Sequence, residues 1–215
     1  MRVEVKVCGL TRASDARVAA ELGARYTGVI FAGGPRTLEP EAARVVLDGG
    51  GPNVDRVGVF GDADTQTIAA TVHSAKLDIV QLHADPGSDK VRAIQEATGA
   101  RVWAVVRVDG ALSAVGLHDL WGKADALVLD SKVAGVLGGS GVSFDWAAAG
   151  RATQGRRGRL VVAGGLTAAN VGEAIETLSP DIVDVSSGVE SSPGIKDHAR
   201  IADFIEAVRR TGVFR

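Results

Sequence analysis

The chain has 215 residues, of which 46% are hydrophobic and 23% are charged, and its formal net charge is -2. This length predicts one domain over residues 1–215, and the charge pattern lacks the basic stripe that nucleic-acid-binding proteins usually show. No apolar stretch is long enough to predict a membrane span. The one cysteine permits no internal disulfide, so a reducing, cytoplasmic setting is expected.

Apolar runs of strand length alternate with helical patterns along the chain. Their starts lie roughly 20 to 35 residues apart, about the length of one strand–helix unit, and strands that alternate with helices form a parallel sheet. The runs begin near Val3, Tyr26, Arg56, Asp78, Arg101, Asp125, Leu160 and Asp181. Eight such units favour a closed α/β fold, the (β/α)8 TIM barrel. An open doubly wound sheet is the alternative, weakened because no G-x-G-x-x-G motif follows the first strand.

Three segments carry signals for helix ends and loops. The helix Ser14–Leu22 is followed by Gly23, a residue typical of helix C-termini, and Thr167 is a candidate N-cap for a later helix. Residues 198–210 predict an amphipathic last helix. The glycine-rich stretch Lys132–Ser143 after the sixth strand is a candidate mobile loop.

Polar residues interrupt the apolar strands on one face only. Because side chains alternate across a strand, the valines of the first strand face the helices while Lys6 and Cys8 point into the barrel. The same count directs His83 on the fourth strand, Asp130 at the end of the sixth and Asp184 on the eighth inward. Polar side chains gathered near the C-terminal ends of several barrel strands predict an active site.

Each of these residues also has a structural interpretation. A lone cysteine such as Cys8 is usually a small buried apolar side chain. Lys6 is explained at least as well as an ion-pair partner of a buried carboxylate, and Asp184 is available for that pairing. His83 taken alone is better explained as a satisfied histidine at a strand end. Helix capping explains Asp130 poorly, because a glycine-rich loop follows it.

Two loops and one arginine suggest anion binding. The candidate phosphate loops contain Gly164 and Gly165 after the seventh strand, and Ser186, Ser187 and Gly188 after the eighth. In barrels these two loops commonly bind phosphate through backbone N–H groups. Arg36, beside the stiffening Pro35, is a candidate anion clamp. The four histidines lack the spacing of metal ligands, so no metal site is predicted.

In this order and spacing, the motifs together resemble the phosphoribosylanthranilate isomerase family of the tryptophan branch. The resemblance covers nearly the whole chain. It rests on VKVCGLT at 5–11, PR at 35–36, VQLH at 80–83, LD at 129–130, GGSG at 138–141, FDW at 144–146, AGGL at 163–166 and VDVSSGVE at 183–190. Gly34 departs from the family pattern, which usually has serine there.

The resemblance implies an Amadori rearrangement of a small phosphosugar, with Cys8 as general base and Asp130 as general acid. It implies that Arg36 holds the anthranilate carboxylate, that His83 and Asp184 contact the substrate, and that the last two loops hold the phosphate. No cofactor is expected, because the substrate supplies its own electron sink. A monomer or homodimer is expected.

Two alternatives stay open at this point. One is a related aminoimidazole-carboxamide ribotide isomerase, or a bifunctional isomerase, in which an aspartate would stand where Cys8 is and a second phosphate loop would lie in the first half of the chain. The other is a non-catalytic barrel that binds phosphosugars, which the pair of Cys8 and Asp130 disfavours.

Overall fold

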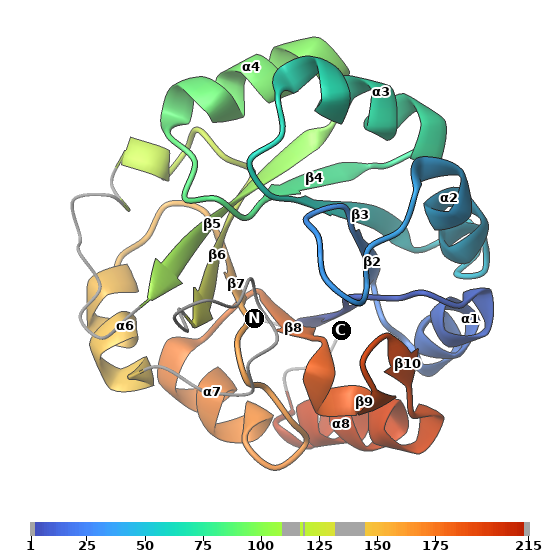
Figure 1. The fold of residues 1–215 in the computed structure, drawn as a ribbon. Helices are drawn as coiled ribbons and strands as arrows, with labels where there is room; N and C mark the ends of the chain where they lie inside the picture. Colours follow the sequence, from blue (N-terminus) through green and yellow to red (C-terminus); the bar gives the residue numbers. More distant parts are fainter. Residues whose placement is uncertain (1–2, 109–116, 118, 132–144, 213–215) are drawn as a thin grey trace.

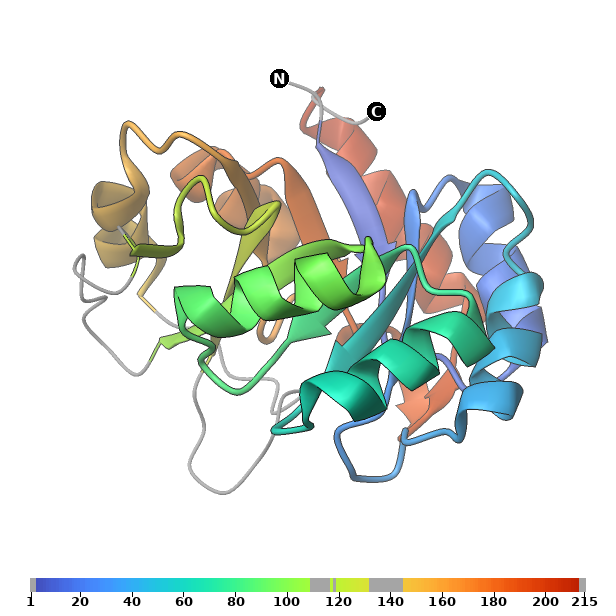
Figure 2. The same ribbon diagram turned by 90° about the horizontal axis from the view of Figure 1, so that it is seen from above.

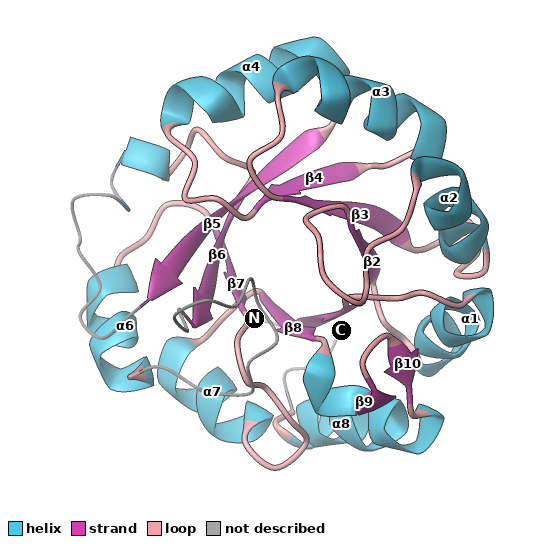
Figure 3. Ribbon diagram, viewed as in Figure 1, coloured by secondary structure: helices cyan, strands magenta, loops and turns pink. Residues whose placement is uncertain are grey.

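The computed structural model describes residues 3–108, 117, 119–131 and 145–212. Eight parallel strands close into a barrel in chain order, and helices surround it (Figures 1 and 3). The strands are β1 (Glu4–Val7), β2 (Tyr26–Ile30), β3 (Asp55–Phe60), β4 (Ile79–Leu82), β5 (Arg101–Val108), β6 (Ala126–Ser131), β7 (Arg159–Val162) and β8 (Ile182–Val185). The helices are α1 (Ala13–Leu22), α2 (Pro40–Asp48), α3 (Thr65–Ala75), α4 (Ser88–Thr98), α6 (Trp146–Thr153), α7 (Val171–Leu178) and α8 (His198–Arg210).

The closed barrel confirms the predicted (β/α)8 fold and excludes the open doubly wound sheet. Closure is direct, because Lys6 of β1 lies in register with Tyr26 of β2 on one side and with Asp184 of β8 on the other. Every predicted strand start lies within one residue of the observed start. Periodicity therefore predicted the strands well, because each is an apolar run bounded by polar residues.

The core has two layers, one inside the barrel and one between the barrel and its helices. Val5 and Val7 belong to the outer layer, as the alternation on β1 predicts. The inner layer is filled by Tyr26, Val57, Ile79, Trp103, Val105, Ala126, Val128, Val161, Ala163 and Ile182. This packing fills the barrel interior below the C-terminal ends of the strands. The polar side chains above it are therefore supported by a closely packed, rigid layer.

The helix-end predictions had different outcomes. Gly23 adopts the left-handed conformation at the end of α1, with φ of 105°, as predicted. The predicted N-cap at Thr167 is wrong, because α7 begins only at Val171. The side chain of Asn170 accepts the Thr167 N–H at 2.7 Å and donates to the Gly165 carbonyl at 2.9 Å, which closes a turn before the helix. The predicted last helix is α8, and the candidate loop 132–143 lies outside the described residues.

A short insertion separates β8 from α8. It consists of the 3-10 helix η1 (Ser187–Val189) and an antiparallel hairpin of β9 (Glu190–Ser192) and β10 (Ile195–Lys196). Figure 2 shows this hairpin at the opposite end of the molecule from the start of β1, on the side toward which β1 runs. The insertion therefore borders the C-terminal mouth of the barrel.

Among the described helices, none has the length and apolar character needed to cross a bilayer.

Candidate active site

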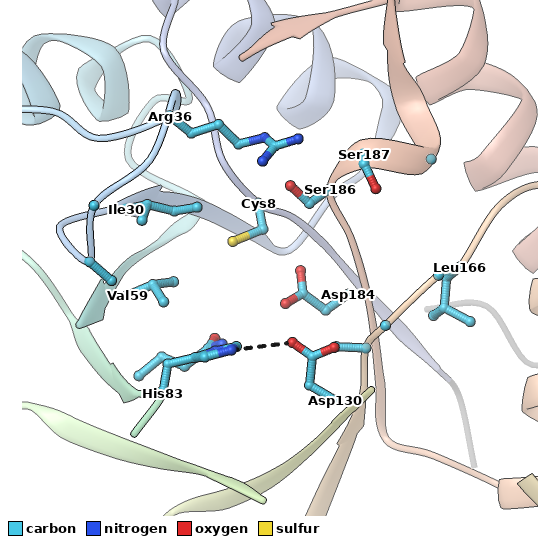
Figure 4. A pocket seen from close by; sticks show the side chains of 17 residues that line it. Cys8, Ile30, Arg36, Val59, His83, Asp130, Leu166, Asp184, Ser186 and Ser187 are labelled. Carbon is cyan, nitrogen blue, oxygen red and sulfur yellow. Dashed lines mark ion pairs between the residues drawn. The ribbon is translucent and has the colours of Figure 1, made fainter. Parts of the chain in front are cut away.

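A pocket opens at the C-terminal ends of the strands and encloses, with its mouth, about 690 Å³ of empty space. It is lined by all ten residues that the sequence singled out, which are Cys8, Arg36, His83, Asp130, Gly164, Gly165, Asp184, Ser186, Ser187 and Gly188. Figure 4 shows the side chains that enter this space. Residues from six strands and their loops thus meet in one cavity, as expected for the catalytic end of such a barrel.

Cys8 lies at the end of β1 beside a buried ion pair. The ammonium of Lys6 donates to Asp184 Oδ2 at 2.7 Å, which is the pairing that the sequence left open. Burial raises the pKa of the Cys8 thiol above its ordinary value, and the positive charge of Lys6 opposes that rise without cancelling it. A β-carbon on Gly28 would lie 3.1 Å from the Cys8 sulfur, so glycine leaves the room that the thiol and Lys6 occupy.

Asp130 lies on β6, three strands away from Cys8 around the barrel, and its carboxyl group is almost fully buried. Burial, assisted by the negative charge of Asp184, raises the pKa of Asp130 to about 6. Asp130 therefore retains its proton to higher pH than an exposed aspartate does. Gly164 has φ of 83° and lies so close that a β-carbon there would be 2.7 Å from Asp130 Oδ1.

The imidazole of His83 faces Asp130 across 3.6 Å, which is longer than a hydrogen bond (Figure 4). Burial lowers the pKa of His83 to about 4, and the charge of Arg107 contributes to this lowering. His83 is therefore neutral near pH 7, so this pair is a contact between a neutral ring and a carboxyl group.

Four buried polar atoms around the pocket have no hydrogen-bond partner within the described part of the chain. They are Gln81 Oε1, His83 Nδ1, Asp130 Oδ1 and Asp184 Oδ1. A buried polar atom without a partner costs about 1–3 kcal/mol, so such atoms are rare unless a ligand satisfies them. These atoms come from β4, from the residue directly after it, and from β6 and β8, and their chemistry suits the hydroxyl groups of a sugar.

Arg36 reaches the pocket from the loop after β2, and its guanidinium is paired with a carboxylate. Its Nε donates to Glu190 Oε1 at 2.8 Å and its Nη2 to Glu190 Oε2 at 2.7 Å. Lys196 is buried next to Glu190 and also contacts its Oε1, at 2.8 Å. Sequence reasoning assigned no role to Glu190 or Lys196. A usable signal was the Pro193–Gly194 turn between them, which is typical of a hairpin that brings its flanking residues together.

The candidate phosphate loops meet on one side of the pocket. Gly164 and Gly165 follow β7, while Ser186, Ser187 and Gly188 lead into η1 after β8. A β-carbon on Gly188 would lie 2.0 Å from the Leu166 carbonyl oxygen, so the two loops are in close contact. Within the described residues, no cluster of three or more His, Cys, Asp or Glu side chains has the arrangement of a metal site.

Fold and pocket together define a single (β/α)8 barrel that gathers acid–base and anion-binding side chains at its C-terminal mouth. A family model described as N-(5'phosphoribosyl)anthranilate (PRA) isomerase matches residues 5–207. The chain belongs to this family.

Known proteins of the same family resemble the chain over its whole length. An N-(5'-phosphoribosyl)anthranilate isomerase of Acidithiobacillus ferrooxidans is 41% identical over 97% of this chain and 98% of its own. The crystal structure of the Thermus thermophilus phosphoribosyl anthranilate isomerase has a TM-score of 0.85 at 32% identity, covering 97% of this chain and 99% of that one. A third relative was solved with reduced 1-(o-carboxyphenylamino)-1-deoxyribulose 5-phosphate; it has a TM-score of 0.81 at 33% identity, with the same coverage.

Proposed function

We propose that this protein converts N-(5'-phosphoribosyl)anthranilate into 1-(2-carboxyphenylamino)-1-deoxyribulose 5-phosphate, a step of tryptophan biosynthesis. The observation that carries the proposal is the meeting of Cys8 and Asp130 in one pocket of a chain that belongs to this isomerase family. The reduced compound seen in a relative has the carbon skeleton of this product, which supports the same substrate here.

Ring opening is the first chemical step, and it needs an acid. A proton must reach the furanose oxygen while the anthranilate nitrogen donates its electron pair to form an iminium ion. We assign this proton to Asp130, because burial and the charge of Asp184 hold the pKa of its carboxyl at about 6, well above an ordinary aspartate. The unpartnered Oδ1 of Asp130 supports a direct contact with the substrate.

Proton removal from C2' is the second step, and it needs a base. The iminium acidifies this proton, so a group of modest basicity suffices. We assign the base to the thiolate of Cys8, with the ammonium of Lys6 nearby to stabilise its charge. The resulting enolamine gains a proton at C1' and loses the proton of its 2'-hydroxyl group, which gives the ketone. The electron pair stays within the substrate throughout, so the step requires no cofactor.

Substrate binding is assigned to the remaining residues of the pocket. Arg36 holds the anthranilate carboxylate, and His83 and Asp184 contact the sugar. The phosphate binds the loops containing Gly164, Gly165, Ser186, Ser187 and Gly188, whose backbone N–H groups suit an anion. In this proposal the sugar lies between Cys8 and Asp130.

The rate should depend on pH in a way that follows from the two pKa values. The reactive form holds a thiolate and a protonated carboxyl, although the pKa of Cys8 is raised above its ordinary value and that of Asp130 is only about 6. That form is a minor species whose population is constant between the two pKa values and falls on either side. We expect kcat/KM to rise with pH up to about 6, to stay level through neutral pH and to fall in the alkaline range.

The phosphate of the substrate also titrates near pH 6, so a control is needed. The residual activity of Asp130→Asn should lack the break near pH 6 that Asp130 causes and should keep rising with pH through the neutral range, because thiolate formation alone then limits it, while the phosphate limb stays in both proteins. A wild-type kcat/KM that climbs tenfold per pH unit through neutral pH would contradict the assignment, because thiolate formation alone would then limit the rate.

Arg36→Ala should raise KM by about tenfold to a hundredfold and leave kcat within a few-fold, because it removes a charge-assisted contact present before and during the reaction. Steady-state kinetics would measure this, with Arg92→Ala as a matched control on an exposed helix face. A KM equal to that of the wild type would remove the carboxylate clamp from the account.

The activity itself is tested with freshly generated N-(5'-phosphoribosyl)anthranilate in a fluorescence assay, alongside the aminoimidazole-carboxamide ribotide substrate. We expect conversion of the first compound and none of the second. Conversion of the second alone would overturn the proposal, and conversion of both would indicate a bifunctional isomerase. Binding of the first without conversion would indicate a barrel that only binds phosphosugars.

A further inference from the structure

Glu190 occupies only one edge of the Arg36 guanidinium. Its carboxylate binds Nε and Nη2 in a bidentate pair, at 2.8 and 2.7 Å. A guanidinium has five N–H donors, so the N–H groups of Nη1 and one N–H of Nη2 stay available on its outer end. Because Arg36 lines the pocket, this outer end is the edge offered to a ligand carboxylate.

The charge balance of this corner depends on Lys196. Arg36 and Glu190 together are neutral, and a neutral pair attracts an incoming carboxylate weakly. Lys196 adds a third charge: its ammonium lies 2.8 Å from Glu190 Oε1, and its side chain is fully buried. The set of three therefore carries a net positive charge in a region that water screens poorly.

Lys196 also touches the second anion-binding region. Its ammonium donates to the carbonyl of Ser186 at 3.0 Å, and Ser186 opens the candidate phosphate loop after β8. The hairpin that carries it is anchored to α1, because the Lys196 N–H donates to the buried Asp15 at 3.2 Å. The same ammonium thus contacts both Glu190 and the backbone carbonyl of the residue that opens the phosphate loop.

We propose that Lys196, acting through Glu190, is a positioning residue that holds the free edge of Arg36 toward the substrate carboxylate and keeps this corner of the pocket positively charged. The inference deepens the proposed function and rests on it, because it assumes that Arg36 receives the anthranilate carboxylate. A purely structural role for Lys196 would affect every ligand of the pocket alike, whereas the proposed role is specific for ligands with that carboxylate.

Direct binding measurements test the proposal with two probes. One is reduced 1-(o-carboxyphenylamino)-1-deoxyribulose 5-phosphate, and the other is its phenylamino analogue without the carboxylate. In Lys196→Met, removal of the ammonium leaves Arg36 and Glu190 as a neutral pair, which attracts a carboxylate weakly, so the Kd of the first probe should rise by about tenfold to a hundredfold. The Kd of the second probe should change by no more than a few-fold. Lys123→Met, on the exposed surface, is the matched control and should bind both probes as the wild type does.

The double variant Glu190→Gln/Lys196→Met separates charge from structure. It removes both partner charges and leaves that of Arg36, so it should bind the carboxylate probe at least several-fold more tightly than Lys196→Met does. Equal loss of both probes in Lys196→Met, or no recovery in the double variant, would overturn the inference while leaving the isomerase activity standing. Arg36→Ala tests the assumption on which the inference rests. If this variant binds both probes as the wild type does, Arg36 does not bind the carboxylate, and the inference about Lys196 is refuted as well.

Discussion

Cys8→Ser should lower kcat by about 10²- to 10⁴-fold, the usual contribution of a general base, while the protein stays folded. A serine hydroxyl is a far weaker acid than a thiol, so at neutral pH almost no alkoxide exists to accept the C2' proton. Serine is also close to cysteine in shape, so it leaves the packing against Lys6 and Gly28 nearly unchanged. Turnover at saturating substrate measures the effect.

Two controls separate loss of the base from loss of the site. The Kd of the reduced product analogue should stay within a few-fold of the wild type, because the sulfur is assigned no role in binding. The far-ultraviolet circular dichroism spectrum should be unchanged. If Cys8→Ser turns over at the wild-type rate, Cys8 is not the base, and the proton acceptor must be sought among the other groups of the pocket.

Asp130→Asn should lower kcat by a similar factor, about 10²- to 10⁴-fold, because an amide has the shape of the protonated carboxyl but cannot transfer a proton to the ring oxygen. Asp89→Asn makes the same chemical change on an exposed side chain of α4 and should leave turnover unchanged. Wild-type turnover in Asp130→Asn would remove the assigned acid.

The same variant should be more stable than the wild type at alkaline pH. The pKa of Asp130 is about 6 in the folded protein, whereas an ordinary aspartate has a pKa of 3.8, so the unfolded chain gives up this proton more readily. Its contribution is fully present below pH 3.8 and is lost as pH rises through about 6. Asparagine has no charge to bury, so at pH 8 we expect a gain in unfolding free energy of up to about 3 kcal/mol. Denaturant unfolding at pH 4 and pH 8 measures the difference, which should appear only at the higher pH.

Strand alternation explains how much of the pocket could be predicted from the sequence. Each strand has a buried apolar outer face, so a polar residue such as Lys6 or Asp184 has one direction left to it. That logic holds within one strand and needs no knowledge of its neighbours. It predicted the inward direction of Cys8, His83 and Asp130, whereas the barrel itself was predicted from the eight alternating strand–helix units.

The sequence could not predict the pKa of each group in the same way, because the pKa depends on opposing effects of burial and of nearby charges. The sequence predicted that Lys6 and Cys8 share the inner face of the first strand, and the charge of Lys6 does act to lower the pKa of the Cys8 thiol. Burial outweighs it, however, so the pKa of the thiol is raised. Desolvation depends on everything packed around the sulfur, and this is a property of the whole fold.

The sequence also could not predict the contacts that the short insertion between β8 and α8 makes. Arg36 was predicted as a clamp on its own, whereas it is held by Glu190, 154 positions later in the chain. A hairpin of such short strands has little periodicity, and the pairing of Glu190 with Lys196 depends on its register. The wrong N-cap at Thr167 has a similar cause, because a threonine before a helix gives no sign that Asn170 closes the preceding turn.

The most direct test of the account is a crystal structure of this protein with reduced 1-(o-carboxyphenylamino)-1-deoxyribulose 5-phosphate. We predict that the Cys8 sulfur lies against C2' and that the Asp130 carboxyl approaches the sugar oxygens from another side. The phosphate should lie on the loops after β7 and β8, and the ring carboxylate on the outer edge of Arg36. A ligand bound outside this pocket, or one in contact with only one of Cys8 and Asp130, would contradict the proposed chemistry.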